Sequence, residues 1–443
     1  TRRDFIKTSA LTAGGLYLGT LPITNSAYAH GNDTIKLALI GCGNRGTGAA
    51  FNALNADDGI KLVAMVDVLE DRLEQSYNIL SSRFGDSGKV DVPEENQFIG
   101  FEKYKEAIAL ADVVILATPT FFRPLHFEEV VSQGKHVFME KPLAVDAMGI
   151  RRVFEAGKIA KEKNLNVVVG LQRRYQNKYR EIYQRIQNGE IGDIISGNIY
   201  WNEGPFGTVD RSAGRSELET QIRNQFLFMW TAGGQILDQL IHNIDIANWF
   251  IGAHPISAQG MGGRFDEITG PEYGQVYDHN FIEYTYSNGV IVAAQCRRMA
   301  NTFNQVAEKI VGSEGSTYTH GFGSDGVIRD RNGNIRYDHD GENDANPYQV
   351  EFDELIASIR SGGIIDNTER GATSTMTAIM GFMAAYTGQV IHWDDALHSN
   401  ARFYPHHDMN PEDLVSWDTP APVMPDENGN YPIPVPGQTQ INV

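Results

Sequence analysis

The chain has 443 residues, of which 41% are hydrophobic and 21% charged, as in an ordinary globular protein long enough for two domains. Its formal net charge of −19 leaves no basic surface to neutralise phosphates, which argues against nucleic acid as a partner and favours small, neutral ligands. The two cysteines, Cys42 and Cys296, are expected to be buried and unpaired.

The first residues carry the pattern of an export signal. Arg2 and Arg3 stand in a charged start, an apolar Gly- and Ala-rich run covers residues 9–21, and residues 27–29 read Ala-Tyr-Ala, a small-residue cleavage pattern. The run is too short to cross a bilayer, so no membrane span is expected. Because the arginine pair resembles a twin-arginine signal, we expect residues 1–29 to direct the protein to the periplasm or otherwise out of the cytoplasm.

The stretch that follows has the order of elements that binds a dinucleotide. Apolar strands are predicted at 35–40 and 60–66, with a helix at 47–54 between them. A G-x-G-x-x-G motif follows the first strand and serves the tight turn, the close approach of the pyrophosphate and the packing of helix on strand. Its glycines are Gly41, Gly43 and Gly46. A glycine-rich turn without a ligand is the alternative, but the complete strand–turn–helix–strand order favours a dinucleotide.

Asp67 ends the second strand about 20 residues past the motif, where a carboxylate accepts hydrogen bonds from the ribose hydroxyls. A 2′-phosphate would meet this negative charge, and Val68 and Leu69 offer no cation. The sequence therefore predicts NAD, with NADP less favoured.

Strands and helices then alternate at short intervals, which predicts a doubly wound parallel sheet. The helices are expected at 69–84, 101–110, 123–133, 146–163 and 177–188, and the strands at 112–117, 136–139 and 166–170.

Beyond residue 192 the pattern changes to α+β with an antiparallel sheet. A hairpin is predicted over 281–295 around Ser287-Asn288-Gly289, an N-G turn. Further strands are expected at 194–201, 306–312 and 317–320, and helices at 350–360 and 372–386. The Pro-rich tail from about residue 400 predicts an extended arm, with disorder as the alternative.

These patterns divide the chain into four parts. After the signal, we expect a Rossmann domain over 30–145, a substrate and oligomerisation domain over 146–395, and the C-terminal arm over 396–443.

Lys141 follows the strand at 136–139, in Glu140-Lys141-Pro142. Ligands of open α/β sheets bind at the carboxyl ends of the strands, so a lysine there can contact both the nicotinamide ribose and a substrate hydroxyl. An ordinary surface lysine is the alternative.

Asp238 and His242 are four residues apart and would share one face of a helix. A carboxylate one turn from an imidazole can orient the ring and raise its basicity, which suits a base that removes a hydroxyl proton. Asp245 is a second candidate for orienting the ring, and a solvated Asp-His face is the alternative. No second histidine stands at ligand spacing, so no metal is expected.

Arg173, Arg174 and Tyr175 follow the strand that ends at residue 170 and are candidates to line the same cleft. Trp201 and Trp230 are candidates for an aromatic wall against a sugar. Ordinary loop positions are the alternative for each.

Together these motifs resemble the glucose–fructose oxidoreductase / inositol dehydrogenase (Gfo/Idh/MocA) family over about residues 35–395. The shared features are the glycine motif with Asp67, then Glu140-Lys141-Pro142, then the D-x-x-x-H of Asp238 and His242. The resemblance implies an α/β protein, with an N-terminal Rossmann domain and a C-terminal α+β domain whose large, open, mainly antiparallel sheet often joins subunits into a homodimer or homotetramer.

The resemblance also implies NAD(P)-dependent redox chemistry on sugars or cyclitols. Lys141 would position cofactor and substrate, Asp238 would support His242, and His242 would be the acid/base. The implied cofactor-binding residues are Gly41, Gly43, Asn44, Arg45, Gly46, Asp67, Thr118, Pro119, Glu140 and Lys141. The implied substrate-binding residues are Lys141, Arg173, Tyr175, Asp238 and His242. The Arg173-Arg174 pair departs from many relatives, so the substrate does not carry over.

Export constrains the chemistry, since no NAD pool is expected outside the cytoplasm. The cofactor would travel bound and be regenerated in place. Either one sugar is oxidised and a second reduced, or one carbon is oxidised transiently so that a glycosidic group is eliminated, water adds and hydride returns. A catalytically inactive sugar-binding protein of the same fold is the remaining alternative.

Overall fold

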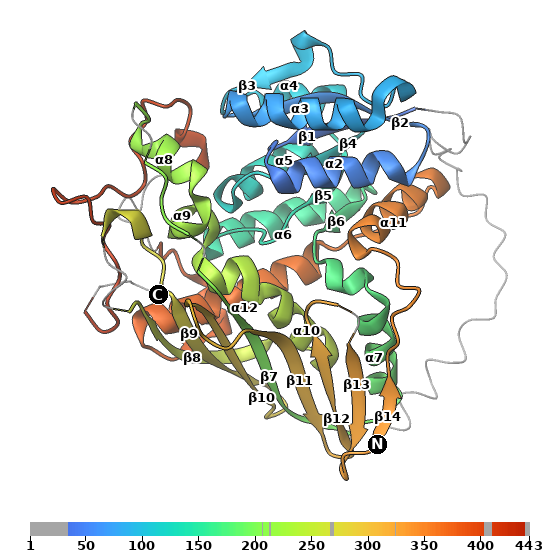
Figure 1. Cartoon of the computed structure of the whole chain (residues 1–443), viewed down its shortest axis with the longest axis vertical. Coiled ribbons are helices and arrows are strands. Elements are labelled where there is room, and N and C mark those ends of the chain that lie inside the picture. Colours follow the sequence, from blue (N-terminus) through green and yellow to red (C-terminus); the bar gives the residue numbers. More distant parts are fainter. Residues whose placement is uncertain are drawn as a thin grey trace.

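The computed structural model describes residues 34–205, 207–211, 214–265, 270–323, 325–402 and 410–438. The export signal predicted at residues 1–29 lies outside this described part. The described chain forms two sheets with helices packed between and around them (Figure 1). No helix in these ranges is long and apolar enough to cross a membrane.

The first sheet has six parallel strands in the order β3-β2-β1-β4-β5-β6, which confirms the doubly wound prediction. Its strands are β1 (Ile35–Ile40), β2 (Ile60–Asp67), β3 (Gln97–Ile99), β4 (Val113–Leu116), β5 (His136–Met139) and β6 (Val167–Val169). The short β3 was not predicted, because three half-exposed residues carry no periodic signal.

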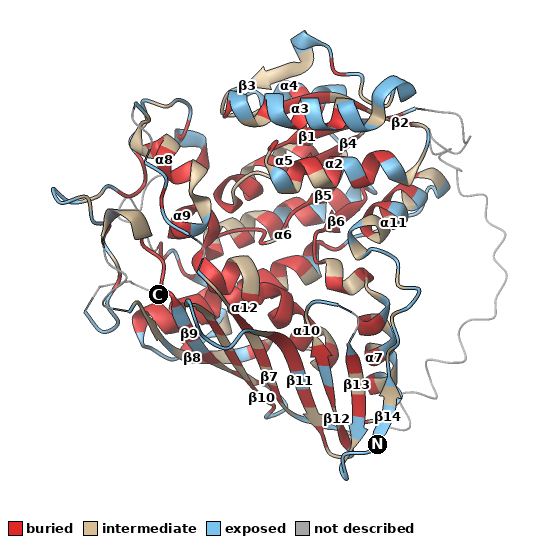
Figure 2. Ribbon diagram, in the orientation of Figure 1, coloured by how far each residue is buried: buried red, intermediate tan, exposed pale blue. Residues whose placement is uncertain are grey.

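Both faces of this sheet are buried, as the near-continuous apolar strands require. Ala38 and Ile40 of β1 belong to one core with residues of α4, α5 and α6. Leu37 and Leu39 belong to a second core with residues of α2, α3 and α11. Figure 2 shows this buried layer across the domain. The helices are α2 (Asn44–Ala56), α3 (Glu70–Phe84), α4 (Tyr104–Leu110), α5 (Arg123–Ser132), α6 (Ala147–Glu162) and α11 (Pro347–Ser361).

The second sheet has nine strands in the order β14-β13-β12-β11-β7-β10-β9-β8-β15. Only β7 and β10 pair in parallel among its described strands, so the sheet is mainly antiparallel, and the predicted β9–β10 hairpin is confirmed. The strands are β7 (Ile194–Glu203), β8 (Pro255–Gly263), β9 (His279–Tyr286), β10 (Ile291–Arg298), β11 (Gln305–Gly312), β12 (Gly315–His320), β13 (Gly326–Asp330), β14 (Ile335–Asp338) and β15 (Ile391–His392).

Helices cover one face of this second sheet and leave the other open (Figure 1). They are α7 (Asn177–Gln187), α10 (Ile241–Ile251) and α12 (Thr368–Thr387). Strands β8 and β13 to β15 were not predicted, since they are Gly-rich, short or exposed. Alternation in β9 places Ile282 and Tyr284 in the core and leaves Phe281 exposed on the open face.

The parts predicted from the sequence are interwoven in the fold. β6 pairs with β5, so the Rossmann sheet continues to Val169, past the boundary predicted at 145. Helix α11 lies within the predicted substrate domain by sequence, but its Phe352 packs against Phe138 of β5 with ring centroids 4.4 Å apart. Helix α12 packs against both α6 and β8 and joins the two units.

The C-terminal segment 410–438 is mostly extended, as expected, with one 3₁₀ helix at Pro411–Asp413 and a few turns. The segment packs against the rest of the same chain. Its Leu414, Val423 and Tyr431 are buried in a core with Phe228 and Trp230. Two further helices contribute to that region, α8 (Glu217–Arg223) and α9 (Met229–Ala232), while α13 (Trp393–His398) packs on α6.

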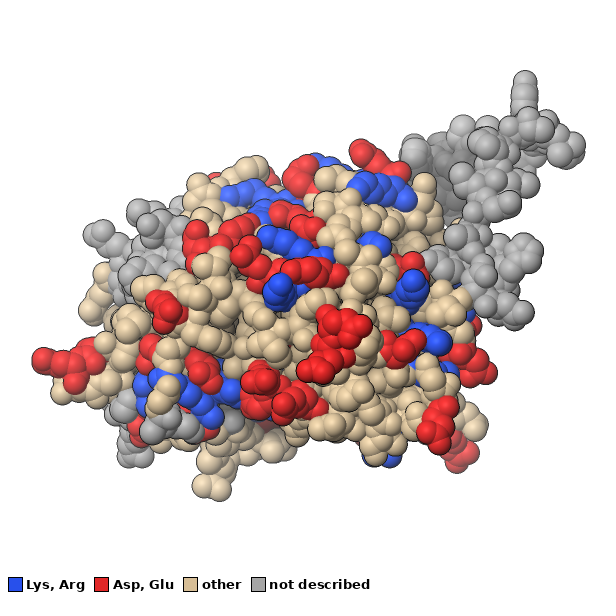
Figure 3. Space-filling model, turned by 90° about the horizontal axis from the view of Figure 1, so that it is seen from above, with Lys and Arg blue, Asp and Glu red and all other residues tan. Residues whose placement is uncertain are grey.

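Figure 3 looks onto the end of the molecule that carries α3 and α4. Lys and Arg side chains are interspersed there with Asp and Glu. Helix α4 and the residues just before it contribute two such pairs, Lys103–Glu106 at 2.8 Å and Lys105–Glu102 at 3.1 Å. Exposed pairs of this kind contribute little to stability.

The glycine turn yields a stability test. An alanine Cβ at Gly46 would lie 1.9 Å from the main-chain oxygen of Gly41 and 3.2 Å from the Cβ of Ala117. We expect Gly46→Ala to lower the free energy of unfolding by about 1–3 kcal/mol, because helix and turn must separate. The control is Gly48→Ala in the same helix, where only Arg45 Nη1 comes near, at 3.8 Å; it should gain up to about 1 kcal/mol. Urea unfolding measures both, and wild-type stability of Gly46→Ala would contradict the packing.

Candidate active site

A cavity of about 340 Å³ lies at the carboxyl ends of β1, β2 and β4. The glycine turn forms its floor: Gly41 has φ +94°, and a Cβ at Gly43 would meet nothing within 4 Å, so the backbone there is open to a ligand. Helix α2 begins at this turn without a side-chain cap. Its first N–H groups therefore point at the cavity and suit a pyrophosphate, so the residues fit a dinucleotide.

Asp67 lines the same cavity and is held by the main chain. Its carboxylate accepts hydrogen bonds from the N–H of Cys42 at 2.6 Å and from the N–H of Leu69 at 2.9 Å. Burial raises the pKa of Asp67, and these two hydrogen bonds oppose that rise. A carboxylate has about four acceptor positions, so capacity remains for ribose hydroxyls.

Cys42 and Cys296 are both buried free thiols, as predicted. Burial raises the pKa of Cys42 well above its usual range, and the charge of Asp67 raises it further. The thiol in the glycine turn is therefore protonated and unreactive.

Thr118 and Pro119 line the cavity, as expected for cofactor-binding residues. Thr118 Oγ1 lies 3.1 Å from Nδ1 of His126, a residue that the sequence did not single out. Burial, and then the charge of Arg123, lowers the pKa of His126 to about 3, so this imidazole is neutral.

Sequence reasoning also missed the far side of the cavity. The residues there come from α8 and the turn after it, more than 150 positions from Asp67: Ile222, Arg223, Gln225 and Phe226. Arg72 and Phe101 add to the rim from the Rossmann side. No local motif marks these residues, because only the tertiary fold brings them to the glycine turn.

Arg45 and Glu140, both expected at the cofactor, form an ion pair with each other. Arg45 also lies over the ring of Tyr348 in α11, 4.7 Å from its centroid. Next to them, both carboxylate oxygens of Glu351 are buried without a hydrogen-bond partner among the described residues. Burial, and then the charge of Glu140, raises the pKa of Glu351 well above its usual range.

Lys141 reaches from the end of β5 to the segment before α10. Its Nζ donates to the main-chain carbonyl of Asp238 and lies 3.3 Å from the Asp238 carboxylate. Both side chains are mostly buried, with exposed fractions of 17% and 14%. The structure thus brings these two predicted residues together and makes Asp238 the partner of Lys141.

This pairing differs from the expected support of His242 by Asp238. The segment Ile236–Leu240 is a π-helical turn, with hydrogen bonds one residue longer than in an α-helix. Residues four apart across such a turn no longer lie directly above one another. Asp238 therefore faces Lys141, and no hydrogen bond joins it to His242 within the described chain.

His242 is 7% exposed, and its Nδ1 is buried without a hydrogen-bond partner among the described residues. Trp201 stacks beside the ring, with centroids 5.6 Å apart and planes at 27°. Burial lowers the pKa of His242 well below its usual value, and the charges of Lys141, Arg173 and Arg45 lower it further. His242 is therefore a neutral imidazole at pH 7, able to accept a proton.

Arg173 lies close to the rings of Trp201 and His242 and is paired with a buried carboxylate. Its guanidinium is 5.3 Å from the Trp201 ring centroid and forms a buried ion pair with Glu308. Glu308 also accepts from Tyr179 at 2.9 Å and from Asn243 at 2.6 Å. These buried contacts hold Arg173 in place next to Trp201 and His242.

The residues that line the cavity do not include Glu140, Lys141, Arg173, Asp238 or His242. Three further sequence-based candidates lie away from both the cavity and the Lys141–Asp238 pair. Tyr175 points into the core, where its hydroxyl donates to Asn367 at 2.9 Å, so it is not beside Lys141. Asp245 accepts from Arg174 at 2.8 Å and from Ser374 at 2.8 Å, so it does not orient His242. Trp230 is fully buried and cannot form a wall against a substrate. Each has the right polarity or size, but the fold pairs it elsewhere.

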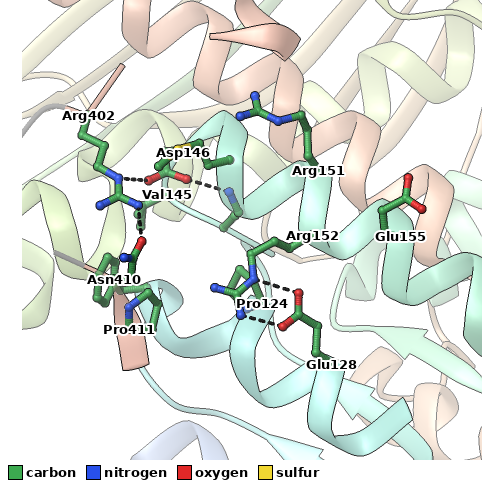
Figure 4. A pocket seen from close by; sticks show the side chains of 14 residues that line it. Pro124, Glu128, Val145, Asp146, Arg151, Arg152, Glu155, Arg402, Asn410 and Pro411 are labelled. Carbon is green, nitrogen blue, oxygen red and sulfur yellow. Dashed lines mark hydrogen bonds and ion pairs between the residues drawn. The ribbon is translucent and has the colours of Figure 1, made fainter. Parts of the chain in front are cut away.

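A second cavity, of about 490 Å³, lies between α5, the start of α6 and the C-terminal segment (Figure 4). Its charged side chains already have protein partners. Arg402 lies 3.6 Å from Asp146 and donates to Asn410 at 2.8 Å, while Arg152 pairs with Glu128 and, at 2.6 Å, with Glu412. These contacts anchor the chain near residue 410 to the Rossmann domain.

The known proteins that this chain matches agree with the geometry. The model of the oxidoreductase family with an NAD-binding Rossmann fold (GFO_IDH_MocA) matches residues 35–171, and that of the GFO/IDH/MocA C-terminal domain matches residues 179–318. The chain belongs to the Gfo/Idh/MocA family. It is thus an NAD-dependent oxidoreductase, and the resemblance inferred from the motifs is confirmed.

Among curated relatives, scyllo-inositol 2-dehydrogenase (NAD(+)) of Bacillus subtilis is 26% identical over 284 residues, 64% of this chain and 73% of that protein. Inositol 2-dehydrogenase of Burkholderia vietnamiensis is 29% identical over 233 residues, 51% of this chain and 57% of that protein. The second match therefore spans little more than half of the relative's length.

Among solved structures, scyllo-inositol dehydrogenase from Lactobacillus casei with bound NAD(H) and scyllo-inositol has a TM-score of 0.60 at 22% identity. The match covers 82% of this chain and all of that one. It supports the two-domain fold described above.

The burial of His242 yields a titration test. Because burial and three nearby cations disfavour its charged form, the ring should stay neutral from pH 8 to below pH 6. In protein labelled with ¹³C-histidine, the His242 signal, assigned with His242→Gln, should not shift over this range. A transition of His242 near pH 6.5 would contradict the site described here.

The buried Glu351 yields a stability test. Its folded pKa lies above the unfolded value, so the folded state retains a proton that the unfolded chain loses, and stability falls as pH rises from about 4.5 toward the folded pKa. Glu351→Gln removes this loss and should gain about 1–3 kcal/mol at pH 8, with little change near pH 4.5. Urea unfolding at both pH values measures the difference. A loss of stability at pH 8 would show that the Glu351 charge is needed.

Proposed function

We propose that the protein oxidises a hydroxyl of a sugar, glycoside or cyclitol with NAD that remains bound and is regenerated in place. The observation that carries the proposal is the meeting of Lys141 with the Asp238 turn, beside a buried, neutral His242 whose Nδ1 lacks a protein partner. A base and a cation so placed next to a dinucleotide cavity suit the removal of a proton and a hydride from one carbinol group.

Each residue has a distinct task in this scheme. A nicotinamide dinucleotide held by the glycine turn and Asp67 would supply the acceptor for the hydride of the carbinol carbon and its donor in the second half-reaction. His242 accepts the hydroxyl proton at an imidazole nitrogen and gives it back on reduction. The Lys141 ammonium holds the substrate oxygen and stabilises the negative charge that develops on it. Asp238 fixes Lys141, and Trp201 packs beside the His242 ring and holds it in place.

The substrate class is supported by the curated relatives, two of which are named as inositol 2-dehydrogenases. A neutral polyol also suits a site that supplies one cation, one neutral base and an aromatic ring. The two arginines after β6, Arg173 and Arg174, are bound to Glu308 and Asp245 and do not read a substrate carboxylate directly.

Retention of the cofactor follows from the export that the first 29 residues predict. A protein outside the cytoplasm would complete one half-reaction and stop unless the hydride returned to a second substrate. We also propose a homodimer or homotetramer joined through the open face of the nine-stranded sheet. That face exposes Ile195, Phe281 and Ile291 on the paired strands β7, β9 and β10.

The proposal is tested on purified protein without added nucleotide. Nicotinamide should be found at close to one equivalent by chromatography of the acid-released cofactor, and a matching sugar or cyclitol should raise absorbance at the reduced-nicotinamide band. Protein free of dinucleotide that needs stoichiometric NAD would contradict residency. Cleavage of a glycoside without net NADH would select the elimination scheme, and binding without any spectral change would identify an inactive relative.

Lys141→Met should lower the rate of cofactor reduction by about 10²–10³-fold, because the developing oxyanion loses its cation. The control is Lys135→Met, which removes a lysine just before the opposite end of β5; among the described residues its Nζ donates only to the Ala109 carbonyl, at 3.4 Å. Single-turnover absorbance measures both. Equal rates for the two variants would exclude the role assigned to Lys141.

A further inference from the structure

The dinucleotide cavity has a second wall that the glycine motif does not supply. Ile222 and Arg223 from α8, with Gln225 and Phe226 from the turn after it, face the glycine turn and Asp67 across the cavity. This segment lies between β7 and α10 and pairs with neither sheet. In an open Rossmann crevice the ligand is exposed to solvent on the side opposite the glycine turn. Here α8 and the turn after it cover that side.

An ion pair ties the second wall to the Rossmann domain. Both terminal nitrogens of Arg223 donate to the Asp71 carboxylate, at 2.9 and 2.8 Å, and its Nε donates to Glu219 at 2.8 Å. The Arg223 guanidinium lowers the pKa of Asp71, so the carboxylate stays charged and paired. Asp71 stands in the first turn of α3, directly after the strand that ends on Asp67. The bidentate contact therefore joins the two walls beside the site expected for the ribose.

The C-terminal segment 410–438 braces this wall from behind. Gln221 of α8 donates to the main-chain carbonyl of Val423 at 2.6 Å and accepts from the indole of Trp230 at 2.6 Å. Tyr431 packs edge-on against Phe228, with centroids 4.8 Å apart. All of these side chains are buried, so α8 cannot move away without exposing them.

The same segment also contacts the opposite wall. Trp417 packs edge-on against Phe101, with ring centroids 4.9 Å apart, and Phe101 lines the cavity from the Rossmann side. Near its start, Glu412 pairs with Arg152 of α6 at 2.6 Å, beside the anchor shown in Figure 4. The segment thus spans both sides of the cavity and resists their separation.

We propose that α8 and the C-terminal segment form a latch that slows release of the dinucleotide. The Arg223–Asp71 pair is its movable contact, and the segment 410–438 is its brace. Release requires that pair to open and α8 to lift from the cavity, while the hydride chemistry at Lys141 and His242 does not. The inference rests on the proposed function only in taking the ligand to be a resident nicotinamide dinucleotide.

The test compares release rates of NADH after each protein has been loaded with it, using nucleotide fluorescence and a chase of excess NAD⁺. Asp71→Asn, which leaves the fold of α3 intact, should release NADH at least about threefold faster than wild type. Trp417→Ala should also accelerate release, since it removes the brace from Phe101. Asp71→Glu, which keeps the negative charge, should release NADH as slowly as wild type.

The matched control is Asp57→Asn, which breaks a similar two-point pair with Arg360, at 2.7 and 3.2 Å, at the far end of α2. Its release rate should equal that of wild type. Release from Asp71→Asn and Trp417→Ala at the wild-type rate would overturn the latch. If purified wild type carries no nucleotide, the proposal of a resident cofactor is wrong. The latch is still tested, because the release rates are compared on protein that has been loaded with NADH.

Discussion

The contact between Lys141 and Asp238 is the constraint on which the rest of the site depends. Lys141 belongs to the Rossmann unit, since it follows β5, and Asp238 belongs to the unit of the nine-stranded sheet. A buried cation must be paired, and here its partner lies across the boundary between the two units. The cation proposed to bind the substrate oxygen and the base proposed to take its proton are thus brought together by domain packing. Neither unit contains the site by itself.

That packing is unusually interwoven for two units joined in sequence. Helix α11 follows the second sheet but covers the first, and α12 contacts both α6 and β8. The C-terminal segment then returns to the cavity rim. Because several separate stretches cross the boundary, the two walls of the cavity are held by many buried contacts, and a large opening between the domains would expose all of them. This rigidity suits a cofactor that stays and a smaller substrate that exchanges.

Much of the first domain could be predicted from local sequence. The glycine motif, Asp67 and the Glu140-Lys141-Pro142 turn act through main-chain geometry within a few residues, so their pattern carries their structure. The prediction that Asp238 pairs with His242 was wrong for a local reason as well. The spacing of four residues assumed an α-helix, whereas the chain forms a π-helical turn at 236–240. Nothing in residue type distinguishes the two, because the extra residue is accommodated by tertiary packing.

The remaining differences are non-local. Arg223 lines the cavity, Trp417 packs against Phe101 at its rim and Tyr175 lies away from it, only because distant elements pack together. The pKa of His242 illustrates the same point, since residues 141, 173 and 45 supply the cations that keep it neutral. In the proposed reaction these charges have a second effect, because they favour negative charge on the substrate oxygen as it loses its proton. The same cations that keep His242 neutral would thus help the hydroxyl to give up the proton that His242 accepts. This coupling of base and cations depends on three separate stretches of the chain, so no single motif encodes it.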